Sequence, residues 1–187
     1  MLDLDFQGMA LWLRMREWFR DPGAELAEAG VYEGQVVLDY GCGIGSYALP
    51  AARLVGSTGV VYALDIHPLA IQAVERRARK EDIANLQTIC SDRDTGLLDG
   101  SLDLVLLYDV LHAVPDKRGL LTELHRVLKT SGRLLVKPDH LDELDFVPFM
   151  AETGLFRLAS RQGETFAFNR LNGTERGDNG ADHPDRG

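Results

Sequence analysis

The chain has 187 residues, 45% of them hydrophobic, and a formal net charge of −9, which are the proportions of one soluble globular domain. Its Lys and Arg residues form no basic run, so we expect no nucleic acid partner, because neutralising phosphates requires concentrated positive charge. No segment approaches the ~20 apolar residues of a membrane span and no signal peptide is evident, so we expect a cytoplasmic protein without a membrane partner.

Residues 9 to 29 predict one or two helices, interrupted at Asp21-Pro22-Gly23. Trp12, Trp18 and Phe19 lie at helical spacing and form an apolar face. We expect residues 1–30 to form a helical cap that serves as a lid, as a helix packed at the sheet edge or as a dimer contact. The oligomeric state stays open.

From residue 35 onward, segments typical of strands and helices alternate. The expected strands are 36–39, 59–65, 86–90, 102–109, 132–137, 155–160 and 164–170, with helices at about 46–55, 68–81, 116–129 and 141–153. Pro50 is compatible with the first of these helices if Ser46 is its cap. The short link around Gly163 forces an antiparallel hairpin. The sequence therefore predicts an α/β fold over residues 31–171, with seven strands, mostly parallel, the last antiparallel.

The remaining residues, 172–187, contain no large apolar side chain, and we expect them to form a disordered tail. The two cysteines, Cys42 and Cys90, show neither disulfide nor zinc-ligand spacing. No metal is therefore expected.

The segment after the first strand holds glycines at alternate positions, in the pattern Asp39-x-Gly41-x-Gly43-x-Gly45. An apolar strand, a glycine turn and a helix open a nucleotide-binding unit, because glycines let backbone N–H groups close on a ligand. A dinucleotide fold requires Gly-x-Gly-x-x-Gly, and its last glycine would stand where this chain has Ser46.

Each of the first five expected strands ends in or beside an acid. These residues are Asp39, Asp65, Asp92, Asp109 and Asp139. Acids at strand ends are also common as helix caps. Like charges gathered at the carboxyl edge of a sheet are nevertheless costly unless a cationic or hydrogen-donating ligand lies among them.

The glycine motif and the spaced acids resemble class I S-adenosylmethionine-dependent methyltransferases over most of residues 31–170. The core is similar to the UbiE and arsenite methyltransferase-like group that acts on small molecules. The resemblance implies a Rossmann-like doubly wound sheet, S-adenosylmethionine as cofactor and a small-molecule substrate. The run Val110-Leu111-His112 resembles the family's fourth-strand motif.

The resemblance also implies a role for individual residues. Gly41 and Gly43 would contact the methionine portion, and Asp39 would brace the turn and meet the ammonium group. Asp65 would bind the ribose hydroxyls and Ile66 the adenine face. The other implied cofactor contacts are Tyr40, Asp92 on the adenine amine, Arg93 through its backbone N–H, and Tyr108, whose ring would narrow the site or simply pack.

Methyl transfer needs a general base only when the nucleophile is protonated. Asp109 and His112 are the candidate catalytic residues. His112 could instead hydrogen-bond the backbone at a helix start, and Asp109 could touch cofactor or substrate. The few cysteines disfavour arsenite as the acceptor, and nothing in the sequence selects another.

Two alternatives to a methyltransferase stand beside this interpretation. The first is a non-catalytic sensor or interaction module that binds S-adenosylmethionine. The second is an NAD(P) reductase, which is disfavoured by Ser46 and by the lack of a Tyr-x-x-x-Lys pair.

Overall fold

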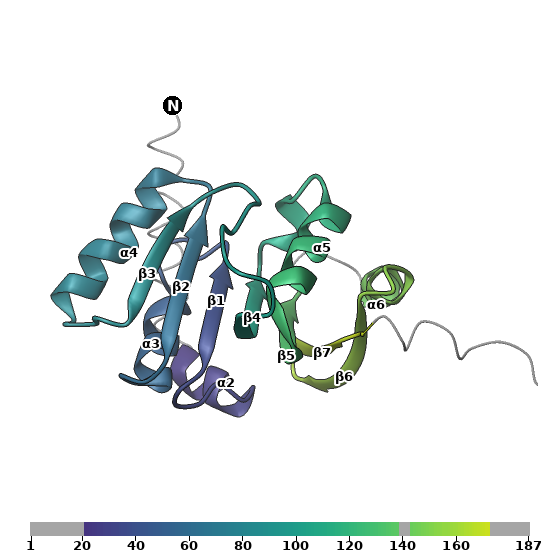
Figure 1. Cartoon of the computed structure of the whole chain (residues 1–187), viewed down its shortest axis with the longest axis horizontal. Coiled ribbons are helices and arrows are strands. Elements are labelled where there is room, and N and C mark those ends of the chain that lie inside the picture. The colour runs from purple at the N-terminus through teal and green to yellow at the C-terminus, as the bar shows by residue number, and fades with distance from the viewer. Residues whose placement is uncertain (1–20, 139–142, 173–187) are drawn as a thin grey trace, which may run out of the picture.

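The computed structural model describes residues 21–138 and 143–172. Seven strands form one sheet in the order β3-β2-β1-β4-β5-β7-β6, which spreads across the molecule in Figure 1. The strands are β1 (Val36–Tyr40), β2 (Val60–Asp65), β3 (Leu86–Cys90), β4 (Leu102–Tyr108), β5 (Leu128–Lys137), β6 (Phe156–Gln162) and β7 (Thr165–Arg170).

All pairings among β1 to β5 are parallel, whereas β7 runs antiparallel to both β5 and β6. This arrangement confirms the predicted seven-stranded sheet with its antiparallel last strand. The predicted hairpin is also present, with Gln162 paired to Thr165.

Helices cover both faces of the sheet. They are α2 (Pro22–Glu28), α3 (Ala48–Val55), α4 (Pro68–Lys80), α5 (Lys117–Val127) and α6 (Glu143–Glu152), with a 3-10 turn η1 at Leu111–Ala113. Residues of α2, α3 and α4 share one hydrophobic core, and residues of α5 and α6 share the other. In Figure 1, α4 lies beside β3 at one end of the sheet and α6 beside β6 at the other.

Successive side chains of the central strands point to opposite faces of the sheet and so belong to different cores. On β4, Leu104 and Leu106 belong to the core of α2, α3 and α4, whereas Val105 and Leu107 belong to the opposite one. All four are fully buried. Burial on both faces explains why these strands read as continuous apolar runs.

The helix starts follow local chemistry. Asp21 caps α2 by accepting hydrogen bonds from the N–H groups of Gly23 and Ala24, and Asp116 caps α5 through Gly119. The helix α3 differs from the expectation. Its cap position is Tyr47, which makes no side-chain cap bond, and Ser46 lies outside it. Pro50 still falls in the first turn, where its missing N–H costs nothing.

β5 begins earlier than predicted, directly after α5. Leu128 pairs with Leu102, and the register then shifts before Arg133 pairs with Leu104. Four residues of β5 therefore lie in a bulge opposite a single residue of β4. Full burial of Leu128 holds this first pairing in place, which local pattern does not reveal.

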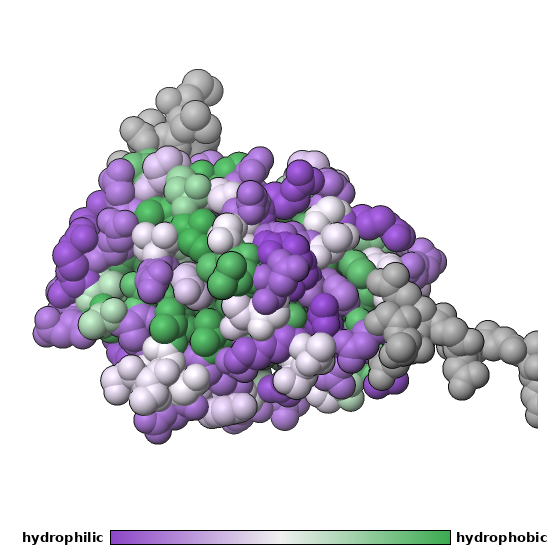
Figure 2. All heavy atoms as spheres, in the orientation of Figure 1, coloured by the Kyte–Doolittle hydropathy of each residue, from purple (hydrophilic) through white to green (hydrophobic). Residues whose placement is uncertain are grey.

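No helix connects β3 to β4. The loop that replaces it leaves side chains on one face of β2 and β3, such as Tyr62 and Ile89, only partly buried. Figure 2 shows hydrophobic surface in the middle of the molecule, with a hydrophilic flank at the left. The expected aromatic face at Trp12, Trp18 and Phe19 and the tail from 173 onward lie outside the described residues.

Candidate cofactor-binding site

The predicted site residues lie at the carboxyl ends of β1 to β4. The sheet order reverses between β1 and β4, which both carry their following loops at this edge. In open α/β sheets, such a reversal opens a crevice for ligands. Asp139, the fifth acid expected at this edge, lies outside the described residues.

The glycine turn after β1 is held against the neighbouring strand. The N–H groups of Gly41 and Cys42 both donate to the Leu64 carbonyl, at 2.8 and 2.9 Å. Gly41 has φ of +77°, and a Cβ there would lie 2.6 Å from Cγ2 of Val110. The turn therefore requires glycine at position 41 for conformation and for space.

Asp39 lies beneath this turn and is 3% exposed. It accepts a hydrogen bond from the Ala48 backbone, whereas its Oδ2 has no partner among the described residues. Burial, and to a lesser degree the charge of Asp65, raises the pKa of Asp39 to about 7. The buried Ser46 hydroxyl likewise lacks a partner in the described chain. A ligand with a cationic hydrogen-bond donor would satisfy the Asp39 oxygen.

Asp65 ends β2 and braces two turns at once. One carboxylate oxygen accepts from the Gly43 N–H and the other from the His67 N–H, both at 2.9 Å. Each carboxylate oxygen can accept more than one hydrogen bond. Ligand hydroxyls can therefore still bind there. The adjacent Ile66 is 58% exposed, which leaves an apolar side chain at this edge.

The loop after β3 is attached to β1 through Tyr40. The Tyr40 hydroxyl donates to the Asp92 carbonyl at 2.7 Å, and burial raises the pKa of Tyr40 to about 12. Arg93 pairs with Asp116 at 2.9 Å. Tyr40 therefore positions the loop from within the sheet, whereas the side chains of Asp92 and Arg93 are exposed.

The end of β4 carries the candidate catalytic residues. Asp109 adopts φ of +56°, which is uncommon for a residue with a side chain, and its N–H donates to the Lys137 carbonyl at 3.2 Å. His112 is exposed on η1. Tyr108 is buried, and its ring meets that of Tyr47 edge-on at 4.8 Å.

Three residues beside this edge, Lys137, Tyr47 and Glu25, have no role predicted from the sequence. Lys137, at the end of β5, is 5% exposed. It donates to the Tyr47 hydroxyl at 3.0 Å and forms an ion pair with Glu25 of α2. The available signal was a single lysine that follows the apolar run 134–136 at a strand end.

The described residues contain no group of three or more His, Cys, Asp or Glu side chains placed to hold a metal ion. Within the same ranges, no helix has the length and apolarity needed to cross a membrane.

Comparison with known proteins places this geometry in a family. Residues 32–163 match a family described as a methyltransferase domain. Aklanonic acid methyltransferase DauC of Streptomyces sp. is 35% identical over 121 residues, which cover 63% of this chain and 54% of DauC. The ubiquinone/menaquinone biosynthesis C-methyltransferase UbiE of Marinomonas sp. is 28% identical over 144 residues, 76% of this chain and 57% of UbiE.

A solved structure agrees with these sequence matches. A S-adenosylmethionine-dependent methyltransferase from Aquifex aeolicus superposes with a TM-score of 0.71 at 25% identity, covering 79% of this chain and 87% of that one. The chain belongs to the methyltransferase domain family and has the fold of class I S-adenosylmethionine-dependent methyltransferases. The expected family, fold and cofactor are thereby confirmed. The matched region covers little more than half of DauC and UbiE.

Proposed function

We propose that this chain transfers a methyl group from S-adenosylmethionine to a small-molecule acceptor. The observation that carries the proposal is the buried, unpartnered Oδ2 of Asp39 beneath the glycine turn. An isolated carboxylate in such a position is costly. An ammonium group bound beside it would remove that cost.

Different residues at the carboxyl edge of the sheet bind different parts of the cofactor. Asp39 faces the ammonium group, and the backbone at Gly41 and Gly43 takes the methionine portion. Asp65 accepts from the ribose hydroxyls and Ile66 covers the adenine. The loop that Tyr40 secures presents Asp92 and the Arg93 N–H to the adenine edge.

The bound cofactor supplies an electrophilic methyl group on a sulfonium. The protein's own contribution is then mainly to position the acceptor and exclude water. Tyr108 narrows the acceptor side of the site, which is the part beside the end of β4 where the methyl acceptor would bind. Asp109 and His112 are the residues proposed to take a proton when the acceptor carries one.

The acceptor class follows from the relatives only as a proposal. DauC is named for aklanonic acid and UbiE for ubiquinone and menaquinone biosynthesis. We extend to this chain the coarser feature they share, which is a small organic acceptor. A cytoplasmic location and the absence of a nucleic acid partner stay predictions.

Titration calorimetry tests the cofactor assignment directly. The protein should bind S-adenosylmethionine and not NAD, and Asp39→Asn should weaken that binding at least tenfold, whereas Asp103→Asn, at the start of β4, should not. Binding of NAD in place of S-adenosylmethionine would refute the proposal. Release of S-adenosylhomocysteine with a metabolite extract separates a methyltransferase from a non-catalytic sensor, which would release none above background.

A further inference from the structure

Lys137 has surroundings unlike those of a surface lysine. Its ammonium group lies 5.2 Å from the centre of the Tyr47 ring and 5.0 Å from that of Tyr108. It also donates to the Tyr47 hydroxyl and pairs with Glu25. Two aromatic faces, a hydroxyl and a carboxylate therefore enclose one buried cation.

This cation is expensive to bury. Removing an ammonium group from water is compensated only when partners satisfy it fully, and a well-packed apolar side chain often stabilises such a position better. Leu134, Leu135 and Val136, which precede it on β5, are fully buried and apolar. The charge at the strand end therefore calls for a role beyond packing.

Its position is the acceptor side of the candidate site. Lys137 pairs with Tyr108 in the β4–β5 register, and its carbonyl accepts from the N–H of Asp109. The nearby Tyr108 hydroxyl is buried, and its polar neighbour is the side chain of Thr165 on β7. A fixed cation with a buried hydroxyl beside it is suited to stabilising an oxyanion.

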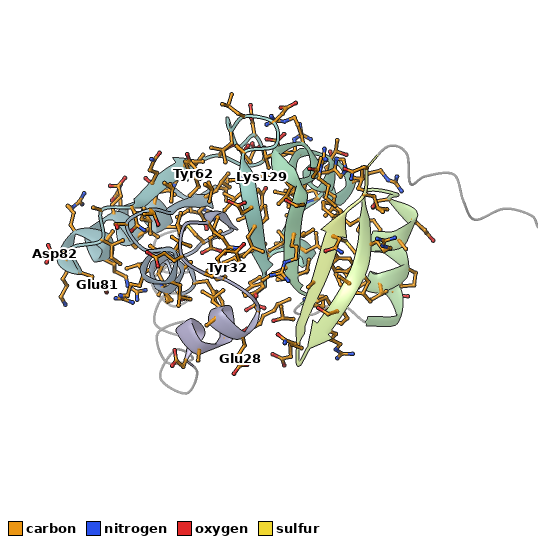
Figure 3. The ribbon with its side chains drawn as sticks, turned by 60° about the horizontal axis from the view of Figure 1, so that its bottom comes forward. Glu28, Tyr32, Tyr62, Glu81, Asp82 and Lys129 are labelled. Atoms are coloured by element: carbon orange, nitrogen blue, oxygen red, sulfur yellow. The ribbon has the colours of Figure 1, made fainter. Side chains whose placement is uncertain are left out.

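Glu25 is the component of this cluster that can be replaced. It lies on α2, outside the sheet, and its side chain is 25% exposed, whereas that of Lys137 is 6% exposed. Glu28, one turn further along α2, is exposed and points away from the sheet (Figure 3). The acidic partner of Lys137 is thus a side chain at the solvent boundary.

We propose that Lys137, flanked by Tyr47 and Tyr108, is the specificity-determining group for an acceptor that binds as an oxyanion, a phenolate or enolate, which takes the place of the Glu25 carboxylate. This inference rests on the proposed methyltransferase function. The phenol or enol releases its proton to solvent on binding. Its electron pair, on oxygen or on the conjugated carbon, is then available to form the bond to the methyl carbon.

A chromogenic phenol tests the proposal without methyl transfer. The phenolate of 4-nitrophenol absorbs visible light and the phenol does not, so titration in the presence of S-adenosylhomocysteine reports which form is bound. The wild-type protein should favour the phenolate. Lys137→Met should lose at least tenfold in phenolate affinity and keep its affinity for S-adenosylmethionine within about twofold, as measured by calorimetry. Lys129→Met, on the same strand (Figure 3), is the matched control and should change neither.

The Glu25 exchange has its own variant pair. Glu25→Gln should raise phenolate affinity several-fold, and Glu28→Gln should leave it unchanged. Equal phenolate affinity in wild type and Lys137→Met, or in Glu25→Gln and Glu28→Gln, would overturn the proposal. If Lys137→Met does not fold, Lys137→Arg, which keeps the charge, should bind phenolate, and the Glu25 pair decides.

Different results would contradict the methyltransferase function and the role of Lys137. A wild-type protein that binds no S-adenosylmethionine contradicts the proposed function. A protein that binds S-adenosylmethionine but does not favour the phenolate contradicts only the role of Lys137.

Discussion

Gly41 and Val110 face each other across the gap between the β1 turn and the end of β4. A Cβ on Gly41 would lie 2.6 Å from Cγ2 and 2.9 Å from Cβ of Val110. The first motif and the fourth-strand motif are therefore one packing unit, although they are far apart in the sequence. This contact fixes how closely the glycine turn approaches the neighbouring strand end.

Substituting Gly41 tests that unit. Gly41→Ala should lower the free energy of unfolding by about 2–4 kcal/mol, because it combines a left-handed backbone with overpacking. Gly154→Ala is the control, since Gly154 has φ of +65° and open space around it, and it should cost only about 1–2 kcal/mol. Urea denaturation measures both. Val110→Ala removes the 2.6 Å contact with Cγ2 but keeps the Val110 Cβ at 2.9 Å, so the double variant Gly41→Ala/Val110→Ala should recover part of the excess loss, and no recovery would contradict the packing argument.

Cofactor affinity should depend on pH through Asp39. Its pKa is about 7 in the unliganded protein, and a bound cation favours the ionised form. Affinity for S-adenosylmethionine should therefore rise between about pH 5.5 and 7.5, with proton release. Asp39→Asn should bind at least tenfold more weakly at pH 7.5, as expected for a lost charged hydrogen bond, and without this slope. Calorimetry in two buffers of different ionisation enthalpy measures both effects.

Asp39 should also make the stability of the unliganded protein depend on pH. A carboxylate in a buried ion pair stabilises the fold as pH rises, whereas Asp39 should destabilise it. At pH values between the ordinary pKa of 3.8 and the raised pKa of about 7, the native state holds the Asp39 proton and the unfolded state does not. Stability is therefore lost as pH rises through this window. The difference in the free energy of unfolding between wild type and Asp39→Asn should change in favour of the variant by a few kcal/mol from pH 4 to 7.5. Urea denaturation of both proteins measures this difference. The same difference at pH 4 and at pH 7.5 would contradict the raised pKa of Asp39.

Ile66 separates binding from folding. Its side chain is 58% exposed, so Ile66→Ala should change the free energy of unfolding by no more than about 0.5 kcal/mol. Covering adenine would bury the same side chain, so affinity for S-adenosylmethionine should fall by about 1 kcal/mol. Leu98→Ala, at a position 79% exposed, is the control. An equal effect of both variants on affinity would refute the adenine contact.

Asp65 and Asp92 should respond differently to truncation. Asp65→Ala leaves the N–H groups of Gly43 and His67 without their acceptor and should cost about 2–4 kcal/mol in stability as well as cofactor affinity. Asp92 is exposed and contacts Tyr40 through its backbone carbonyl, so Asp92→Ala should weaken cofactor binding only. Thermal denaturation alongside calorimetry resolves the two. A stability loss in Asp92→Ala would show that its side chain has a structural role.

Local patterns in the sequence were sufficient to predict the strands and helices of this sheet. Pro68 at the first position of α4 and Asp116 at the cap of α5 mark their starts in the sequence. The acids at the ends of β1 and β2 were identifiable because parallel strands bring their carboxyl ends to one edge. The start of β5 could not be predicted, since Leu128 is placed by its partner on β4.

The acceptor side was predicted less well, for a related reason. Tyr47, Tyr108 and Lys137 come from three separate elements, and Glu25 from a fourth. No spacing in the sequence signals that they meet. The second hydrogen bond of Asp65, which braces the glycine turn, is equally invisible before the loops are placed.

The attachment of α2 to β5 sets how much of the chain is needed for folding. Arg133 donates to the Ala29 carbonyl at 3.0 Å, and Leu26 is fully buried in the core shared with α3. A truncated protein starting at residue 31 would lack all of α2 and leave a cavity where Leu26 packs, so we expect it to be expressed mainly as insoluble material. We therefore expect the smallest unit that folds on its own to start at or before Asp21, upstream of residues 32–163, which match the methyltransferase domain family.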